Sequence, residues 1–112
     1  MAGFERPEPS LRSSRESDPE VEFQIDAFVI GLGETVDALQ DAEAAGQLAL
    51  LRDLSESLIL RARELGYESL SEAAEQIVEA SRDPSPDAAR KAVESFTELS
   101  KRARRGHRSA AP

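Results

Sequence analysis

The side chains that could carry chemistry in this chain are few, because it has one histidine and no cysteine. An imidazole acts as a general base or takes up a phosphoryl group only when a rigid element positions it. His107 follows Gly106 in a polar C-terminal stretch, where we expect no such element. The sequence therefore predicts no catalytic role for His107. The lack of thiols excludes disulfides and cysteine-based metal sites.

Two further patterns are typical of ligand sites but lack essential parts. Glu72, Glu75 and Glu79 gather carboxylates, without the histidines or the second matching helix that di-metal bundles use. The segment Gly31-Leu32-Gly33 lacks the third glycine, the lysine and the preceding strand of a nucleotide-binding loop. We therefore expect neither a metal nor a cofactor, and we interpret the glutamates as a solvated helix face.

Residues 48–65 contain the most informative pattern in the chain. Apolar side chains recur there at steps of three and four residues, as the inward face of an α-helix requires: Leu51, Leu54, Leu58, Ala62 and Leu65. The opposite face should carry Arg52, Glu56, Ile59, Leu60 and Arg63. An apolar pair flanked by charges on an outward face is typical of a contact surface. The sequence thus predicts a partner-binding site made of these five residues.

Two of these positions have alternative interpretations. Glu56 is either a solvated acid paired with Arg52 one turn earlier, or a partial imitation of a phosphorylated side chain. Ile59 and Leu60 are either covered by other parts of the chain, or form the dry centre of an interface whose polar rim includes Arg63.

The chain contains four segments with helical periodicity, over about residues 18–45, 48–65, 69–81 and 86–101. Asp18-Pro19 and Ser85-Pro86 are typical helix starts, Ser69 with Glu72 is a capping-box pattern, and glycines follow the first two helices. Short connections predict an all-α, antiparallel up-down four-helix bundle. Gly31 and Gly33 each weaken the first helix by roughly 1 kcal/mol, so a kink or a split is expected there.

The composition indicates one domain between two polar ends. We expect a disordered leader over residues 1–17, the bundle over 18–101 and a basic disordered tail over 102–112. The net charge is −8, with 18 acids against six bases in residues 19–100 and five bases without an acid in 101–108. An acidic body repels phosphates, so we expect no nucleic-acid partner. Because no stretch approaches the ~20 apolar residues of a membrane span, we expect a soluble cytoplasmic protein.

The order of motifs from about Phe28 to Ala80 resembles the histidine phosphotransfer (HPt) domain of two-component signalling. That family ends its first helix with Ala-Gly-Asp, carries Ala-His-x-Leu-Lys-Gly on the next helix, and then turns at Gly-Phe or Gly-Ala. Here Ala45-Gly46-Gln47 is similar to the first element, Leu58 to the leucine and Gly66-Tyr67 to the turn. Residues 70–74 continue the pattern.

The functional positions depart from the family. Glu56 stands where the family has its phosphorylated histidine, Ile59 replaces the lysine, Leu60 replaces the glycine, and Ser55 replaces the alanine. The resemblance implies a binding module without phosphotransfer activity, whose partner is a response-regulator receiver domain or a histidine-kinase component of a phosphorelay. The alternative is a helical-bundle assembly protein that forms a homodimer through the same apolar residues and has no part in phosphate signalling.

Overall fold

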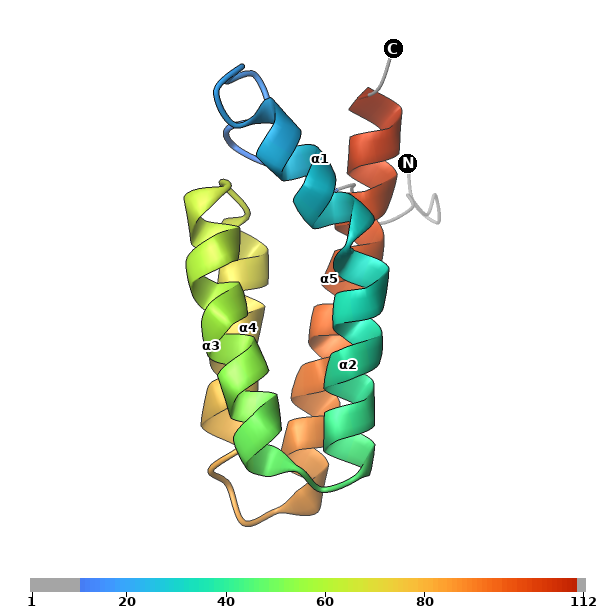
Figure 1. The fold of residues 1–112 in the computed structure, drawn as a ribbon. Coiled ribbons are helices and arrows are strands. Elements are labelled where there is room, and N and C mark those ends of the chain that lie inside the picture. Colours follow the sequence, from blue (N-terminus) through green and yellow to red (C-terminus); the bar gives the residue numbers. More distant parts are fainter. Residues whose placement is uncertain (1–10, 111–112) are drawn as a thin grey trace, which may run out of the picture.

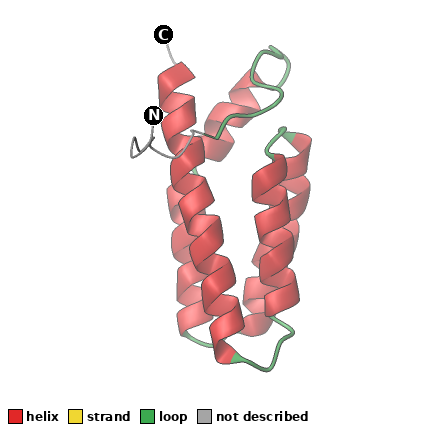
Figure 2. Cartoon of the chain, turned by 180° about the vertical axis from the view of Figure 1, so that it is seen from behind, coloured by secondary structure: helices red, strands yellow, loops and turns green. Residues whose placement is uncertain are grey.

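The computed structural model describes the backbone of residues 11–110 and the side chains of residues 11–107. Within that range the chain forms five helices and no strand: α1 (Glu22–Ile30), α2 (Leu32–Ala44), α3 (Leu48–Glu64), α4 (Glu68–Ala80) and α5 (Pro86–Ala110). From α2 onward each helix packs antiparallel to its neighbours, and short loops join them (Figures 1 and 2). The all-α prediction is confirmed.

The first predicted helix is split at Gly31, one of the two glycines at which a kink or break was expected. The backbone hydrogen bonds continue across the split, since Gly31 N–H donates to Ala27 O at 3.0 Å and Thr35 N–H donates to Gly31 O at 3.1 Å. The chain therefore bends without unwinding. As a result α1 leans away from the line of α2, towards the end of the bundle where α3 finishes (Figure 1).

The turns after α2 and α3 depend on glycines in the left-handed region. Gly46 has φ 71° and Gly66 has φ 82°, a conformation that glycine adopts without a Cβ penalty. In each turn the N–H groups of the glycine and of the next residue donate to carbonyls of the last helical turn, at 2.8 to 3.2 Å. Both turns were predicted, and each reverses the chain within a few residues.

The predicted capping box at the start of α4 does not form. The helix begins at Glu68, one residue before Ser69, and its N-cap is Tyr67, which makes no side-chain capping bond. The reason is that the turn at Gly66 already sets the direction of the chain, and Tyr67 is buried there instead of a capping serine.

Residues 11–17 are held against the bundle, which corrects the predicted disordered leader for this part; residues 1–10 lie outside the described residues. The buried Ser13 hydroxyl donates to Leu65 O at the end of α3. Leu11 N–H donates to Arg102 O of α5 at 3.1 Å. This segment therefore links the end of α3 to α5.

The predicted boundary at residue 101 is also corrected, because α5 continues to Ala110; residues 111 and 112 are not described. Ala103 is fully buried, and Gly106 is buried against the backbone of Leu11. The basic run from Lys101 is thus helical and partly packed, because the N-terminal segment and α1 extend the surface on which α5 lies.

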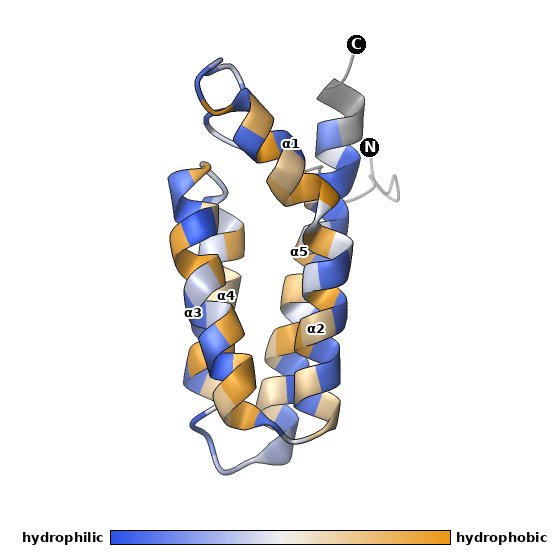
Figure 3. Cartoon of the chain, viewed as in Figure 1, coloured by the Kyte–Doolittle hydropathy of each residue, from blue (hydrophilic) through white to orange (hydrophobic). Residues whose placement is uncertain are grey.

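The core lies between α2, α3, α4 and α5, extends to Ile25 and Val29 of α1, and is mainly aliphatic, as the composition predicts. Its largest fully buried side chains are Phe96, Leu32, Leu39, Leu51, Leu65, Leu70 and Ile77. Hydrophobic residues also continue along α1 (Figure 3). The closest packing joins α3 to α4, whereas α2 meets α3 along a much smaller contact. In the described part of the chain, no helix has the length and apolar character to span a bilayer.

Candidate functional site

The α3 helix positions all five residues of the predicted partner-binding site, here called the α3 surface: Arg52, Glu56, Ile59, Leu60 and Arg63. The inward side of the helix is anchored by Leu51, Ser55, Leu58 and Ala62, which are buried. The Ser55 hydroxyl donates to Leu51 O at 2.8 Å, so its polar group is satisfied within the helix. Small residues at Ser55 and Ala62 allow α4 to approach closely.

Glu56, Leu60 and Arg63 are the exposed members of the α3 surface. Leu60 is 68% exposed, and Glu56 is also exposed. The predicted pair between Glu56 and Arg52 does not form, because Arg52 Nε instead donates to Ser81 Oγ, at 3.2 Å, near the end of α4. Among the described residues Glu56 has no hydrogen-bond or ion-pair partner. Its carboxylate is available to a cation of another molecule.

Ile59 lies differently from its neighbour Leu60. It is half-buried and packs against the core, and its carbonyl accepts a hydrogen bond from the Ser71 hydroxyl of α4 at 3.3 Å. The expectation that both aliphatic side chains meet water is therefore fulfilled for Leu60 and only partly for Ile59. The reason is the close packing of α4, which covers this side of α3.

Arg63 forms an ion pair with Glu75, with Arg63 Nη2 and Glu75 Oε1 2.9 Å apart on the exposed edge between α3 and α4. This pairing gives Glu75, one of the three glutamates predicted to form a solvated helix face, a structural partner. In the described part of the chain, no three carboxylate or imidazole side chains gather closely enough to hold a metal ion.

His107 is held by α5 and contacts α1, not a disordered tail as predicted. Its Nε2 lies 2.8 Å from Asp26 Oδ1, and the two side chains are 28% and 50% exposed. A histidine paired with a carboxylate is oriented, which a catalytic base needs. The pair connects α1 to the last turns of α5.

The sequence did not reveal an open groove between α1, α2 and α3, here called the α1–α3 groove. Its volume is about 620 Å³, and its apolar lining includes Ala27, Phe28, Ala38, Leu54 and Leu58. Leu54 was predicted to lie in the core, but it is half-buried because α2 does not close over it. The sequence does contain one indication of an apolar surface here. Phe23 and Ile30 are large apolar residues, but their spacing places them outside the inward face of α1.

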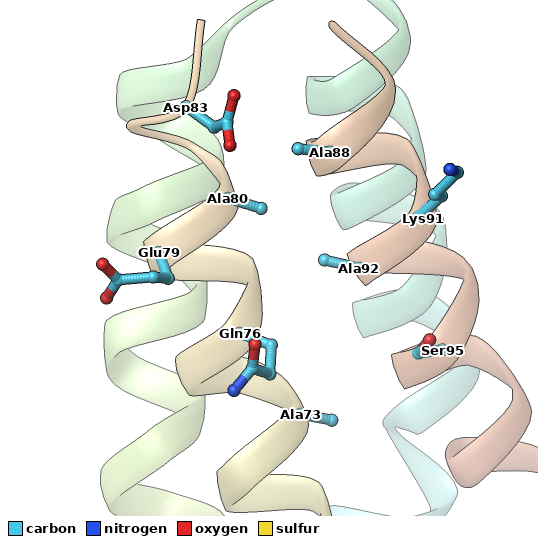
Figure 4. Close-up of a pocket in the computed structure, with 9 residues that line it drawn as sticks. All are labelled: Ala73, Gln76, Glu79, Ala80, Asp83, Ala88, Lys91, Ala92 and Ser95. Carbon is cyan, nitrogen blue, oxygen red and sulfur yellow. The ribbon is translucent and has the colours of Figure 1, made fainter. Parts of the chain in front are cut away.

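A second hollow of about 430 Å³ lies between α4 and α5. Alanines line both of its walls, with Ala80 on α4 facing Ala88 and Ala92 on α5, while Glu79 and Lys91 point away from the gap (Figure 4). Short side chains leave this space unfilled. Its lining offers no convergent set of functional groups.

Comparison of the chain with protein-family models, with curated proteins and with solved structures gave no match. The likeness to the HPt family therefore depends on the sequence motifs, and the structure adds an all-α bundle of antiparallel helices.

Proposed function

We propose that this chain is a non-catalytic, HPt-like protein-interaction module of a phosphorelay, which binds a response-regulator receiver domain or a histidine-kinase component through the α3 surface. One observation carries the proposal. Glu56, at the position that matches the phosphoacceptor histidine, is exposed on the outward side of α3 and has no partner among the described side chains, and the exposed Leu60 lies one turn further on.

The chemistry of Glu56 supports binding in place of transfer. A phosphohistidine relay needs an imidazole nitrogen that is nucleophilic near neutral pH and returns the phosphoryl group readily. A carboxylate places a negative charge at the same position. It can attract the basic groups that a partner uses to recognise a phosphorylated histidine, with a smaller charge and fewer acceptor oxygens than a phosphoryl group has.

The energetic centre of the interface would be Leu60. Burying an exposed leucine side chain contributes about 1.5–3 kcal/mol, whereas a surface ion pair contributes about 1 kcal/mol or less. Arg63 and Arg52 are already engaged with Glu75 and Ser81, so they form the polar rim. Leu60 replaces the family's glycine, and its side chain gives the partner an apolar contact.

A restored variant tests the scaffold. The triple variant Glu56→His, Ile59→Lys, Leu60→Gly restores the histidine, lysine and glycine of the family pattern and leaves Ser55 unchanged. Purified receiver domains phosphorylated with acetyl phosphate serve as donors. We expect the wild-type chain to stay unlabelled and the folded triple variant to acquire acid-labile phosphate. Acid-labile label on the wild type would contradict the loss of transfer. A folded triple variant that no receiver labels would contradict the HPt-like scaffold.

A matched pair of leucine variants tests the α3 surface. Leu60→Asp and Leu50→Asp both alter exposed leucines of α3, which are 68% and 46% exposed, on different sides of the helix. Binding to receiver or kinase domains, measured by calorimetry, should be lost in Leu60→Asp and kept in Leu50→Asp, with both variants equally stable. Equal binding by both variants would remove the proposed surface.

A second candidate function is assembly through the same residues, favoured by the exposure of Leu60. In that case sedimentation velocity would show a homodimer that Leu60→Asp converts to monomers. A monomer at all accessible concentrations would exclude this candidate.

A further inference from the structure

The α1–α3 groove is continuous with an exposed apolar stripe on α1. Phe23 and Ile30 are 82% and 78% exposed, and they lie seven residues apart, which is about two helical turns. Ala27, one turn from each, is exposed and also lines the groove. The half-buried Phe28 and Leu54 form its floor. The apolar surface therefore extends from the groove over the outer side of α1.

Monomeric proteins in water rarely expose such a contiguous apolar surface. Burying the two large side chains would remove apolar surface from water, and a contiguous apolar patch beside a groove is typical of a protein-interaction site. The groove persists because α2 packs only lightly against α3, while Phe28 is held by Tyr67, with ring centroids 5.7 Å apart.

The two helices on one side of the groove, α1 and α2, carry acids and no base. Nine acids and no base lie between Arg15 and Arg52, and α1 and α2 carry six of these acids. The base on the facing wall is Arg61 of α3, and it is already engaged: its NH1 lies 3.4 Å from Gln24 Oε1 and 3.9 Å from Glu64 Oε2. An anionic partner would be repelled, whereas a cationic one would be attracted.

From this combination we infer that the α1–α3 groove binds a basic amphipathic helix of another protein. The helix would lay its apolar side chains into the groove and over Phe23 and Ile30, at the three- and four-residue spacing of helix-in-groove recognition. Its Lys and Arg side chains would face the acids of α1 and α2, such as Glu34 at the edge of the groove.

A second copy of this chain fits the groove less well. Symmetric pairing of α1 with α1 would bring acidic faces together without a base between them. In the chain's own basic helix, at the end of α5, the apolar side chain among the described residues 101–107 is Ala103, which is fully buried within its own fold. Residues 101–107 therefore supply basic charges but present no exposed apolar side chain that could enter the groove.

The test uses the full chain and a synthetic 18-residue peptide of leucine, lysine and alanine, with leucines at helical spacing on one face. One control peptide has the same composition in scrambled order, and another has glutamate in place of lysine. Titration of the ¹⁵N-labelled chain, followed by NMR, should shift resonances of α1, α2 and the Leu54–Arg61 side of α3. Binding should weaken by about tenfold or more at high salt, and neither control peptide should bind.

Variants of exposed residues locate the contact. Phe23→Ser and Ile30→Ser should each weaken peptide binding by about tenfold, as expected for loss of a buried large side chain. Leu50→Ser is the matched control, since Leu50 is also exposed and lies outside the groove, and it should bind the peptide as the wild type does. Charge reversal in Glu34→Lys should weaken binding and reduce its salt dependence.

Several results would overturn the inference. These are equal binding of the scrambled peptide, resonance shifts confined to α4 and α5, or unchanged affinity in Ile30→Ser. Self-association of the chain that is lost in Phe23→Ser would assign the groove to a second copy. The Leu60→Asp variant distinguishes this inference from the proposed function. It should abolish receiver binding through the α3 surface and leave peptide binding in the groove intact.

Discussion

Gly46 and Gly66 share a left-handed backbone conformation but have different surroundings. A Cβ added to Gly46 would meet no atom within 4 Å. A Cβ added to Gly66 would lie 2.7 Å from Ser14 Oγ, 2.8 Å from Ser13 Oγ and 2.9 Å from Arg15 N. At the residue scale, Gly66 is therefore needed both for the turn and for the close packing of residues 13–15 against it.

Substituting alanine at each glycine separates the two requirements. Gly46→Ala should lower the free energy of unfolding by about 1–2 kcal/mol, the cost of placing a Cβ in the left-handed region. Gly66→Ala should lower the free energy of unfolding by about 1–3 kcal/mol more than Gly46→Ala does, because Ser13 and Ser14 must also move. Urea denaturation measures both variants. Equal losses would contradict the docking of the segment at residues 13–15.

Tyr67, in the turn between α3 and α4, reports on the packing of Phe28 of α1 against that turn. Burial raises the pKa of its phenol to about 12, and the negative charge of Glu16 acts in the same direction. Because the folded pKa lies above the unfolded value of about 10, the phenol contributes stability below pH 10 that is lost as the pH rises through 12.

The titration of Tyr67 can be observed directly, since the chain has one tyrosine and no tryptophan. Absorbance at the phenolate band should show a midpoint at about 12 in the native chain and at about 10 in urea. In Phe28→Ala the native midpoint should move towards the unfolded value, because the ring that covers Tyr67 is removed. A native midpoint equal to that in urea would show that Tyr67 is not buried.

At the scale of elements, α5 owes its length to contacts with the N-terminal part of the chain. Gly106 lies where the Leu11 carbonyl approaches the helix, and any Cβ there would collide with it. Gly33 in α2 has room for a Cβ, because the nearest atom to an added Cβ would be a guanidinium nitrogen of Arg104, 3.8 Å away. One helical glycine is thus required by packing, and the other is not.

The two glycines should respond oppositely to alanine. Gly33→Ala should raise the free energy of unfolding by about 0.4–1 kcal/mol through a less flexible unfolded chain. Gly106→Ala should lower it by about 1–3 kcal/mol, since the clash with Leu11 outweighs the better helix propensity of alanine. Thermal denaturation of both variants checks the signs. Stabilisation by Gly106→Ala would mean that residue 11 does not pack against α5.

At the scale of the whole molecule, the packing is uneven. The α3–α4 pair has the most extensive contact, whereas α1 contacts α2 and α5 only lightly and presents large apolar side chains to water. Its ties to the rest are side-chain contacts, such as His107 with Asp26 and Phe28 with Tyr67. The molecule therefore has a closely packed helix pair, α3 and α4, and a loosely packed helix, α1, beside the groove.

Amide hydrogen exchange should reveal this difference. We expect the slowest exchange in α3 and α4, with free energies of opening near that of global unfolding, and faster exchange throughout α1. The leucine–lysine peptide should slow exchange in α1 when it binds. Protection of α1 equal to that of α3 in the free chain would contradict the uneven packing.

The sequence by itself determined what depends on local chemistry. Left-handed glycines at Gly46 and Gly66 and a proline at Pro86 set where helices end and begin, and the 3.6-residue period placed Leu51 and Leu58 inside. These features need only neighbouring residues, so they could be predicted, together with the weak point at Gly31.

The tertiary structure decided whatever depends on segments far apart in the chain. The approach of α4 covers Ile59 and leaves Leu60 free, residues 11–17 gain their place from α3 and α5, and the extension of α5 depends on Leu11 and α1. The α1–α3 groove arises in the same way, because the width of the gap between α2 and α3 is set by packing across the whole bundle.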